Sequence, residues 1–140
     1  MIVAHYVSMP DLETCRLPDF REARHPSRVY EGSGNDAGCV VTVFDSALSQ
    51  SDTNPRALSV SASQSIKDCC AHFDWGNVDA GALQLAIALL HDVSGDADTA
   101  LRWYEHFART YVRELPATWT VPELDIALWL YCFQNARPGA

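Results

Sequence analysis

The sequence predicts an α+β fold, in which a small antiparallel β-sheet from the N-terminal half packs against three α-helices from the C-terminal half. The first half holds β-rich segments around a glycine-containing loop, and the second half holds apolar residues at the spacing of amphipathic helices. A chain of 140 residues with 48% hydrophobic content can bury one core, but is too short for two ordinary domains. We therefore expect residues 1–140 to form a single domain.

A hairpin forms the centre of the predicted sheet. Val29–Glu31 and Cys39–Phe44 are rich in β-branched and aromatic residues and flank the loop GSGNDAG, which predicts a connection longer than two residues. The opening IVAHYV, residues 2–7, is expected to add a strand, because a lone hairpin is only marginally stable in water. The segment Ala47–Ser65, rich in Ser, Asn and Pro, is typical of a loop broken by short ordered pieces.

The first predicted helix begins at Asp79 and runs to about Val93. The Asp79 carboxylate is expected to cap the free amides of the first turn. Gly95 is expected to end the helix, because glycine tolerates the left-handed backbone of a C-terminal cap. One buried face is predicted from the apolar periodicity: Leu83, Ala86, Ile87 and Leu90.

The second predicted helix begins at Asp96 or Asp98 and is stopped by Pro116, which cannot continue a helix. Charged residues lie off its apolar stripe. The stripe consists of Ala100, Tyr104, Phe107, Tyr111 and Leu115.

The third predicted helix follows Thr120 and Glu123, whose spacing is that of a capping box. From Leu124 to Phe133 it is apolar on all sides, which indicates burial on several sides or a subunit interface. A homodimer is therefore one hypothesis, with these self-association residues: Leu124, Leu128, Trp129, Tyr131 and Phe133.

Four segments in this order resemble a small family known only as a domain of unknown function and found in bacteria, plasmids and phages. They are RVYEGSGNDAGCVVTV from residue 28, FDWG from residue 73, QLAIALL from residue 84 and LPATWT from residue 115. The resemblance implies a core over residues 29–131, with residues 1–28 as an N-terminal extension and 137–140 as a tail. It implies no activity. The family's glycine-rich turn after F-x-W-G is reduced here to Gly76-Asn77-Val78-Asp79, so we expect a structural turn that binds no ligand.

Charge excludes some classes of partner. Ten Lys and Arg against 18 Asp and Glu give a formal charge of −8, which repels nucleic-acid phosphates and anionic lipid surfaces. No apolar run approaches the roughly 20 residues that span a bilayer, and the N-terminus lacks the layout of a signal peptide. The five cysteines are odd in number and do not suggest a disulfide framework. We expect a cytoplasmic protein that binds neither membrane nor nucleic acid directly.

Cys69, Cys70 and His72 are the candidate chemical residues of the chain. They could serve a small enzyme or a metal protein, and this is the alternative function. A structural zinc site uses four ligands, usually as two closely spaced pairs, and the sequence offers no second pair. The sequence therefore favours a protein with no catalytic residues, no metal and no cofactor.

An acidic rim is the stronger pattern, because no Lys or Arg occurs from residue 68 to residue 100. Its members are Asp68, Asp74, Asp92, Asp96 and Asp98. Such carboxylates can steer a protein partner with a basic surface. The leading hypothesis is a non-enzymatic interaction module, more concretely a phage or mobile-element protein that inhibits a host defence or nucleic-acid-binding protein such as a CRISPR effector.

Overall fold

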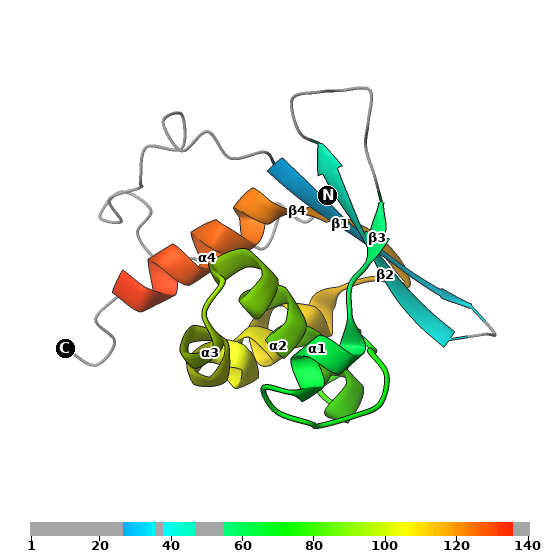
Figure 1. The fold of residues 1–140 in the computed structure, drawn as a ribbon, viewed down its shortest axis with the longest axis horizontal. Helices are drawn as coiled ribbons and strands as arrows, with labels where there is room; N and C mark the ends of the chain where they lie inside the picture. The colour runs from blue at the N-terminus through cyan, green and yellow to red at the C-terminus, as the bar shows by residue number, and fades with distance from the viewer. Residues whose placement is uncertain (1–26, 36–37, 47–54, 136–140) are drawn as a thin grey trace.

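The fold was obtained as a computed structural model, which describes residues 27–35, 38–46 and 55–135. It is the predicted α+β architecture, with a layer of helices on one face of an antiparallel sheet (Figure 1). The strands are β1 (Ser27–Asn35), β2 (Gly38–Ser46), β3 (Arg56–Ala57) and β4 (Thr118–Pro122), in the spatial order β3-β2-β1-β4. The helices are α1 (Val60–Gln64), α2 (Ala80–Ser94), α3 (Ala97–Thr110), the 3₁₀ turn η2 (Val112–Glu114) and α4 (Glu123–Asn135).

The hairpin is confirmed, but its connection is shorter than predicted. The pairing of β1 with β2 continues to Asn35 opposite Gly38, so only residues 36 and 37 separate the strands. The prediction of a longer connection was wrong because the glycines near the loop still pair as strand residues. The strand predicted at residues 2–7 lies outside the described residues.

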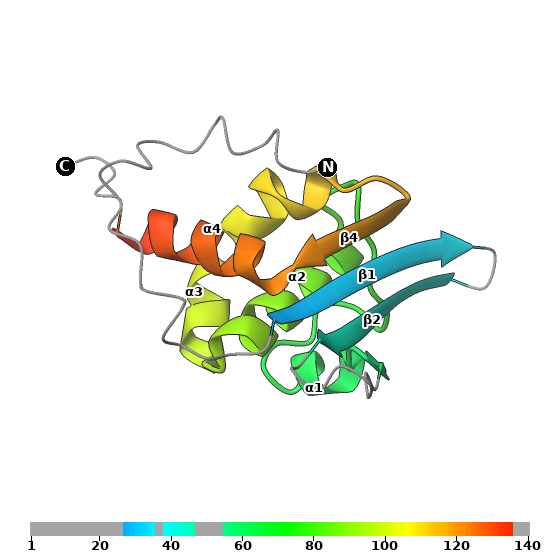
Figure 2. The same cartoon turned by 90° about the horizontal axis from the view of Figure 1, so that it is seen from above.

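The two faces of the sheet differ in burial. Tyr30, Val43 and Val121 are at most 1% exposed and belong to the core formed with the helices. On the opposite face, Glu31 and Thr120 lie side by side and are exposed. Figure 2 shows β2, β1 and β4 side by side, with α4 leaving from the end of β4.

The strand β4 was not predicted, and it replaces the predicted capping box. Thr120 pairs with Glu31 in the sheet, so it cannot act as the N-cap, and α4 begins directly at Glu123. The Glu123 carboxylate instead accepts a hydrogen bond of 3.0 Å from the backbone amide of Arg28. Pairing between strands far apart in the sequence therefore overrides a locally favourable cap.

The helix α2 is the centre of the core. Its residues from Gln84 to Leu90 are all buried, so the buried surface is wider than the single face predicted from periodicity, while Leu83 is half-buried. Gly95 is the C-cap, at φ 72°, as predicted. Asp79 occupies the N-cap position, but its side chain makes no capping hydrogen bond, so the predicted capping carboxylate was wrong. Asn77 orders this turn instead, since its Oδ1 accepts from the Asp79 amide at 2.8 Å.

The helix α3 begins as predicted and ends earlier. Asp96 is its N-cap, with a carboxylate that accepts from the Thr99 amide at 3.2 Å. The helix stops at Thr110, six residues before Pro116, because the backbone of Tyr111 leaves the helical region and the chain tightens into η2. The predicted apolar stripe is buried throughout.

Asp96 and Asp79, the N-cap residues of α3 and α2, should therefore contribute differently to the free energy of unfolding. Asp96→Ala is expected to lower the free energy of unfolding, because a capping hydrogen bond is lost. Asp79→Ala is expected to cost less than about half of that, since only the favourable interaction of a carboxylate with the helix dipole disappears. Urea denaturation of both variants measures the difference, and an equal loss for the two would contradict the assigned caps.

Candidate functional site

The glycine hairpin, the FDWG turn and the LPATWT segment meet in one packing cluster. The indole of Trp119 lies directly on Gly32, where a Cβ atom would collide with the ring. Trp75 packs edge-on against Trp119, with ring centroids 5.4 Å apart and an interplanar angle of 87°. The Trp75 Nε1 donates to the carbonyl of Ala117 at 3.3 Å. These segments of the resemblance thus join the sheet to the turn before α2.

The FDWG turn uses its polar groups internally. The Asp74 carboxylate accepts from the amide of Trp75 at 2.8 Å and from Nδ2 of Asn77 at 3.1 Å. The Asp74 amide donates to the carbonyl of Gly81 at 3.1 Å, and a Cβ at Gly81 would lie 2.7 Å from that of Asp74. The turn therefore holds the first turn of α2 in place, which agrees with the expected structural role.

Gln84 is a buried polar hub with 0% exposure. Its Oε1 accepts from the amides of Cys69 at 2.6 Å and Cys70 at 2.8 Å. Its Nε2 donates to Ser63 Oγ at 2.8 Å and to the Lys67 carbonyl at 3.0 Å. All hydrogen-bonding groups of this side chain thus hold the segment between α1 and the FDWG turn. A glutamine inside the otherwise apolar run from Ala80 to Leu90 was the sequence signal for it.

The candidate thiols lie on that segment. Cys70 Sγ is 3.7 Å from His72 Nε2. Burial raises the pKa of the Cys69 thiol, which disfavours the nucleophilic thiolate. Within the ranges that the structure describes, no three His, Cys, Asp or Glu side chains lie together as a metal site. The enzyme or metal alternative built on Cys69, Cys70 and His72 stays a prediction without support from this geometry.

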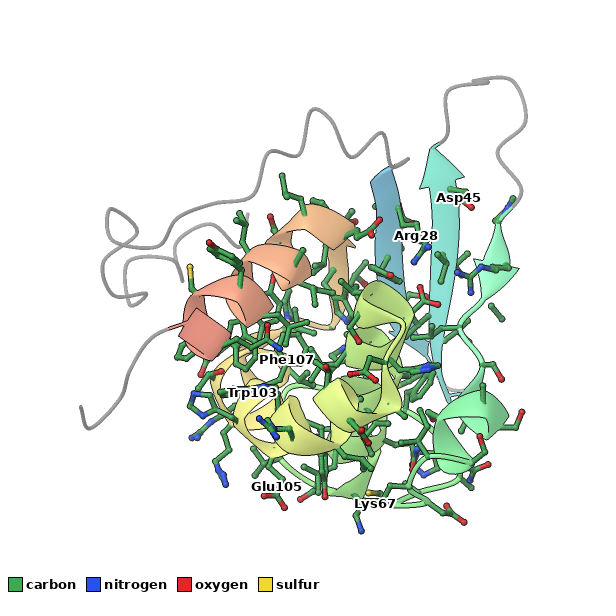
Figure 3. The ribbon with its side chains drawn as sticks, turned by 60° about the vertical axis from the view of Figure 1, so that its left-hand side comes forward. Arg28, Asp45, Lys67, Trp103, Glu105 and Phe107 are labelled. Atoms are coloured by element: carbon green, nitrogen blue, oxygen red, sulfur yellow. The ribbon has the colours of Figure 1, made fainter. Side chains whose placement is uncertain are left out.

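Asp92, predicted as part of the acidic rim, ties the sheet to the end of α2. Its Oδ2 accepts from the Tyr30 hydroxyl at 2.7 Å and lies 3.2 Å from the Arg28 guanidinium, while Oδ1 lies 3.3 Å from that of Arg56. Figure 3 shows Arg28 at the start of β1. The pKa of the Tyr30 hydroxyl lies well above its usual range; burial is the larger cause and the hydrogen bond to Asp92 the second. Two arginines thus compensate the charge of Asp92.

Tyr30→Phe tests this connection. The variant keeps the ring and removes only the hydroxyl, so we expect a loss of about 2 kcal/mol in the free energy of unfolding, as for a hydrogen bond to a charged group. Thermal and urea denaturation measure it. Tyr111→Phe is a suitable control, because Tyr111 is also a buried tyrosine, and its hydroxyl has no hydrogen-bond partner among the described residues. A loss no larger than in the control would contradict the connection.

The structure divides the predicted acidic rim between the two ends of α2. Asp74 lies against Gly81 in the first turn, and Asp92 lies in the last, about 16 Å further along the helix at 1.5 Å per residue. Asp68 accepts from Gln64 Nε2 at 3.1 Å. These carboxylates therefore do not form one continuous group.

A polar depression of about 240 Å³ lies where α3 begins and α4 ends. It is lined by Asp96, Asp98, Thr99, Arg102 and Gln134. The amide and the hydroxyl of Thr99 both donate to the Asp96 carboxylate, and these bonds lower the pKa of Asp96. The Asp98 carboxylate, in contrast, is exposed and receives no hydrogen bond from the described side chains. The two aspartates were predicted as site residues, and Thr99 and Arg102 beside them on α3 were not. Gln134 could not be predicted, because the approach of α4 to α3 is a long-range contact.

The predicted self-association residues on α4 are only partly available. Trp129 is 2% exposed, and its Nε1 donates to Thr110 Oγ1 at 3.2 Å. Phe133 packs edge-on against His106 at 4.9 Å between centroids. Figure 3 shows Trp103 and Phe107 between α3 and α4. Of the five, Leu124 is the exposed one, at 42%, and Leu128 and Tyr131 are half-buried.

Comparison with known families identifies the chain at the level of family. Residues 30–131 match the profile of a family of unknown function, DUF6166. The chain belongs to this family. The DUF6166 match includes Gly32, Trp75, Gln84 and Trp119, so the predicted resemblance to a family of unknown function is confirmed. No curated protein and no solved structure matched the chain.

None of the helices in residues 27–35, 38–46 and 55–135 combines the length and the apolar character needed to cross a membrane.

Proposed function

We propose that this DUF6166 chain is a non-enzymatic interaction module that binds a basic surface of a protein partner through the turn between α2 and α3. The observation that carries the proposal is the depression that Asp96 and Asp98 share. The Asp98 carboxylate is exposed there and receives no hydrogen bond within the described ranges, so it can pair with an incoming lysine or arginine. Asp74 and Asp92 are used within the fold, so the proposed contact is narrower than the predicted rim.

The charge of the whole chain supports the same class of partner. A formal charge of −8 accelerates the approach of a basic surface and slows that of an acidic one. Arg102 lies one helical turn from Asp98 in the same depression, and it can fix the orientation of a partner that carries both signs of charge. The specific form of the proposal is a mobile-element protein that occupies the nucleic-acid-binding surface of a host defence protein, such as a CRISPR effector. Its support is the net negative charge of the chain and the resemblance to a family found in bacteria, plasmids and phages.

Capture from a lysate of the encoding organism tests the proposal. Wild-type chain is immobilised beside Asp98→Lys, which reverses the exposed charge. Glu114→Lys is the matched control, because Glu114 is also an exposed carboxylate, at the opposite end of the α3–η2 segment. We expect a stoichiometric partner on wild type and on the control, weakened at moderate ionic strength and lost on Asp98→Lys. Recovery of no stoichiometric partner at low or moderate ionic strength, or equal capture by all three, would contradict the proposal.

A further inference from the structure

The two edges of the sheet are protected to different degrees. Exposed edge strands invite pairing with other chains, and natural proteins blunt them with short strands or charged side chains. The edge strand β3 has only two residues, one of them Arg56, and so carries both protections. The edge strand β4 has five residues, TWTVP, and no charged side chain, so its one protective residue is Pro122 at its C-terminal end.

The outer edge of β4 is unpaired in the part of the chain that the structure describes. The strand pairs with β1 alone, and no other backbone hydrogen bond reaches Thr118–Pro122. Thr118, Thr120 and Pro122 are exposed. Figure 2 shows β4 at the margin of the three long strands. Alternate amides and carbonyls of β4 therefore face outward without partners from the described residues.

We propose that β4 pairs antiparallel with β4 of a second copy of the chain, about a two-fold axis at Thr120. In this register Thr120 lies opposite Thr120, and Trp119 lies opposite Val121 of the other copy. The two four-stranded sheets then become one continuous sheet. The pairing is isologous, so it closes as a dimer and leaves β4 with no free edge.

The side chains of β4 suit this register. Threonine pairs are favourable directly across antiparallel strands, and the exposed Thr120 of one copy would face Thr120 of the other on the axis. Trp119 and Val121 alternate with exposed threonines, so each copy extends the buried face and the polar face of the other. The self-complementary sequence favours a second copy over an unrelated strand.

Like charges do not meet at this seam, although each chain carries −8. In the two-fold register, Glu123 lies opposite Ala117. Glu31 pairs with Thr120 inside each copy, so the two Glu31 residues are three strand spacings apart, about 14 Å. That separation exceeds the screening length of about 8 Å at physiological ionic strength.

A charge-swap experiment tests the pairing, with light scattering as the readout. Thr120→Glu and Thr120→Lys each place two like charges opposite each other on the axis. We expect wild type at twice the mass of one chain and each variant alone as a monomer. An equimolar mixture of the two variants should regain the double mass, because opposite charges then face each other. Ser33→Glu and Ser33→Lys are the controls, since Ser33 is exposed on β1, one strand inward, and these variants should stay dimeric.

Far-UV circular dichroism is the check that wild type and the four variants are all folded. A wild-type monomer, dimers that survive both Thr120 substitutions, or a mixture that stays monomeric would each overturn the proposal. Pairing of β4 with another segment of the same chain, such as residues 2–7, would give a monomeric wild type, and so would also overturn it. A dimer formed through α4 would leave the Thr120 variants dimeric, and this result would also overturn the proposal.

Discussion

Gly32→Ala is expected to lower the free energy of unfolding by about 3 kcal/mol, at the upper end of the usual cost of overpacking a core. The new methyl group would collide with the indole of Trp119, which lies against the glycine and is itself only 3% exposed. The ring cannot move away freely, because Trp75 lies edge-on against it. Urea denaturation measures the loss.

Gly34→Ala is the matched control, two positions along the same strand. A Cβ there would lie 3.5 Å from Cys39 Sγ and 3.8 Å from Trp75 Cζ2, which are ordinary contacts. We expect its stability to change by less than about 1 kcal/mol, because alanine suits a strand interior slightly better than glycine. Equal losses at the two positions would show that backbone effects dominate and that Trp119 is not pinned on Gly32.

Gln84→Leu is expected to cost about 4 kcal/mol, because the shape is nearly kept while four hydrogen bonds of the buried side chain are lost, at about 1 kcal/mol each. The amides of Cys69 and Cys70 and the Lys67 carbonyl are the groups left unpaired. Hydrogen exchange should also show those amides losing protection. The effect is local, so exchange at the β1–β2 hairpin should change less.

Gln64→Leu is the control for this substitution. Gln64 is half-buried and donates to Asp68 Oδ1 and to the Cys70 carbonyl, groups that water can reach once the amide is gone. We expect a loss of about 1 kcal/mol. A Gln84→Leu protein as stable as this control would mean that Gln84 is not a structural hub, and its buried amide would become a candidate ligand-binding group.

Features encoded by neighbours in the sequence were predictable. Gly95 ends α2 and Asp96 begins α3, as predicted, because a helix stop and a helix start depend on the local backbone. The hairpin strands and the buried stripe of α3 also follow from periodicity. The carboxylate of Asp79 was predicted to cap and does not, because Asn77 provides the hydrogen bond that orders this turn.

Features that depend on distant residues were not predictable from one sequence. The strand β4 exists because it pairs with β1, and the bond from Arg28 to Glu123 spans 95 residues. The local pattern from Thr120 to Glu123 instead indicated a capping box. Asp92 was expected on an open rim, but arginines 64 and 36 residues away compensate its charge. Charge patterns along a chain give no information about which charges are paired in space.

The segments of the resemblance therefore hold the fold together. Gly32 and Trp119 fix the sheet, Asp74 fixes the start of α2, and Gln84 fixes the segment before it. Partner binding is proposed to fall to Asp98, a surface residue outside the motifs, whereas the proposed dimer seam lies at Thr120, within LPATWT.

Capture of the partner by Asp98→Lys, compared with Glu114→Lys at equal folded content, is the most direct test of that central claim. We expect Asp98→Lys to lose a partner that Glu114→Lys retains. The free energy of unfolding of Asp98→Lys should stay within about 1 kcal/mol of wild type, the cost of a reversed charge at a helix N-terminus. Equal capture by the two variants would contradict the claim.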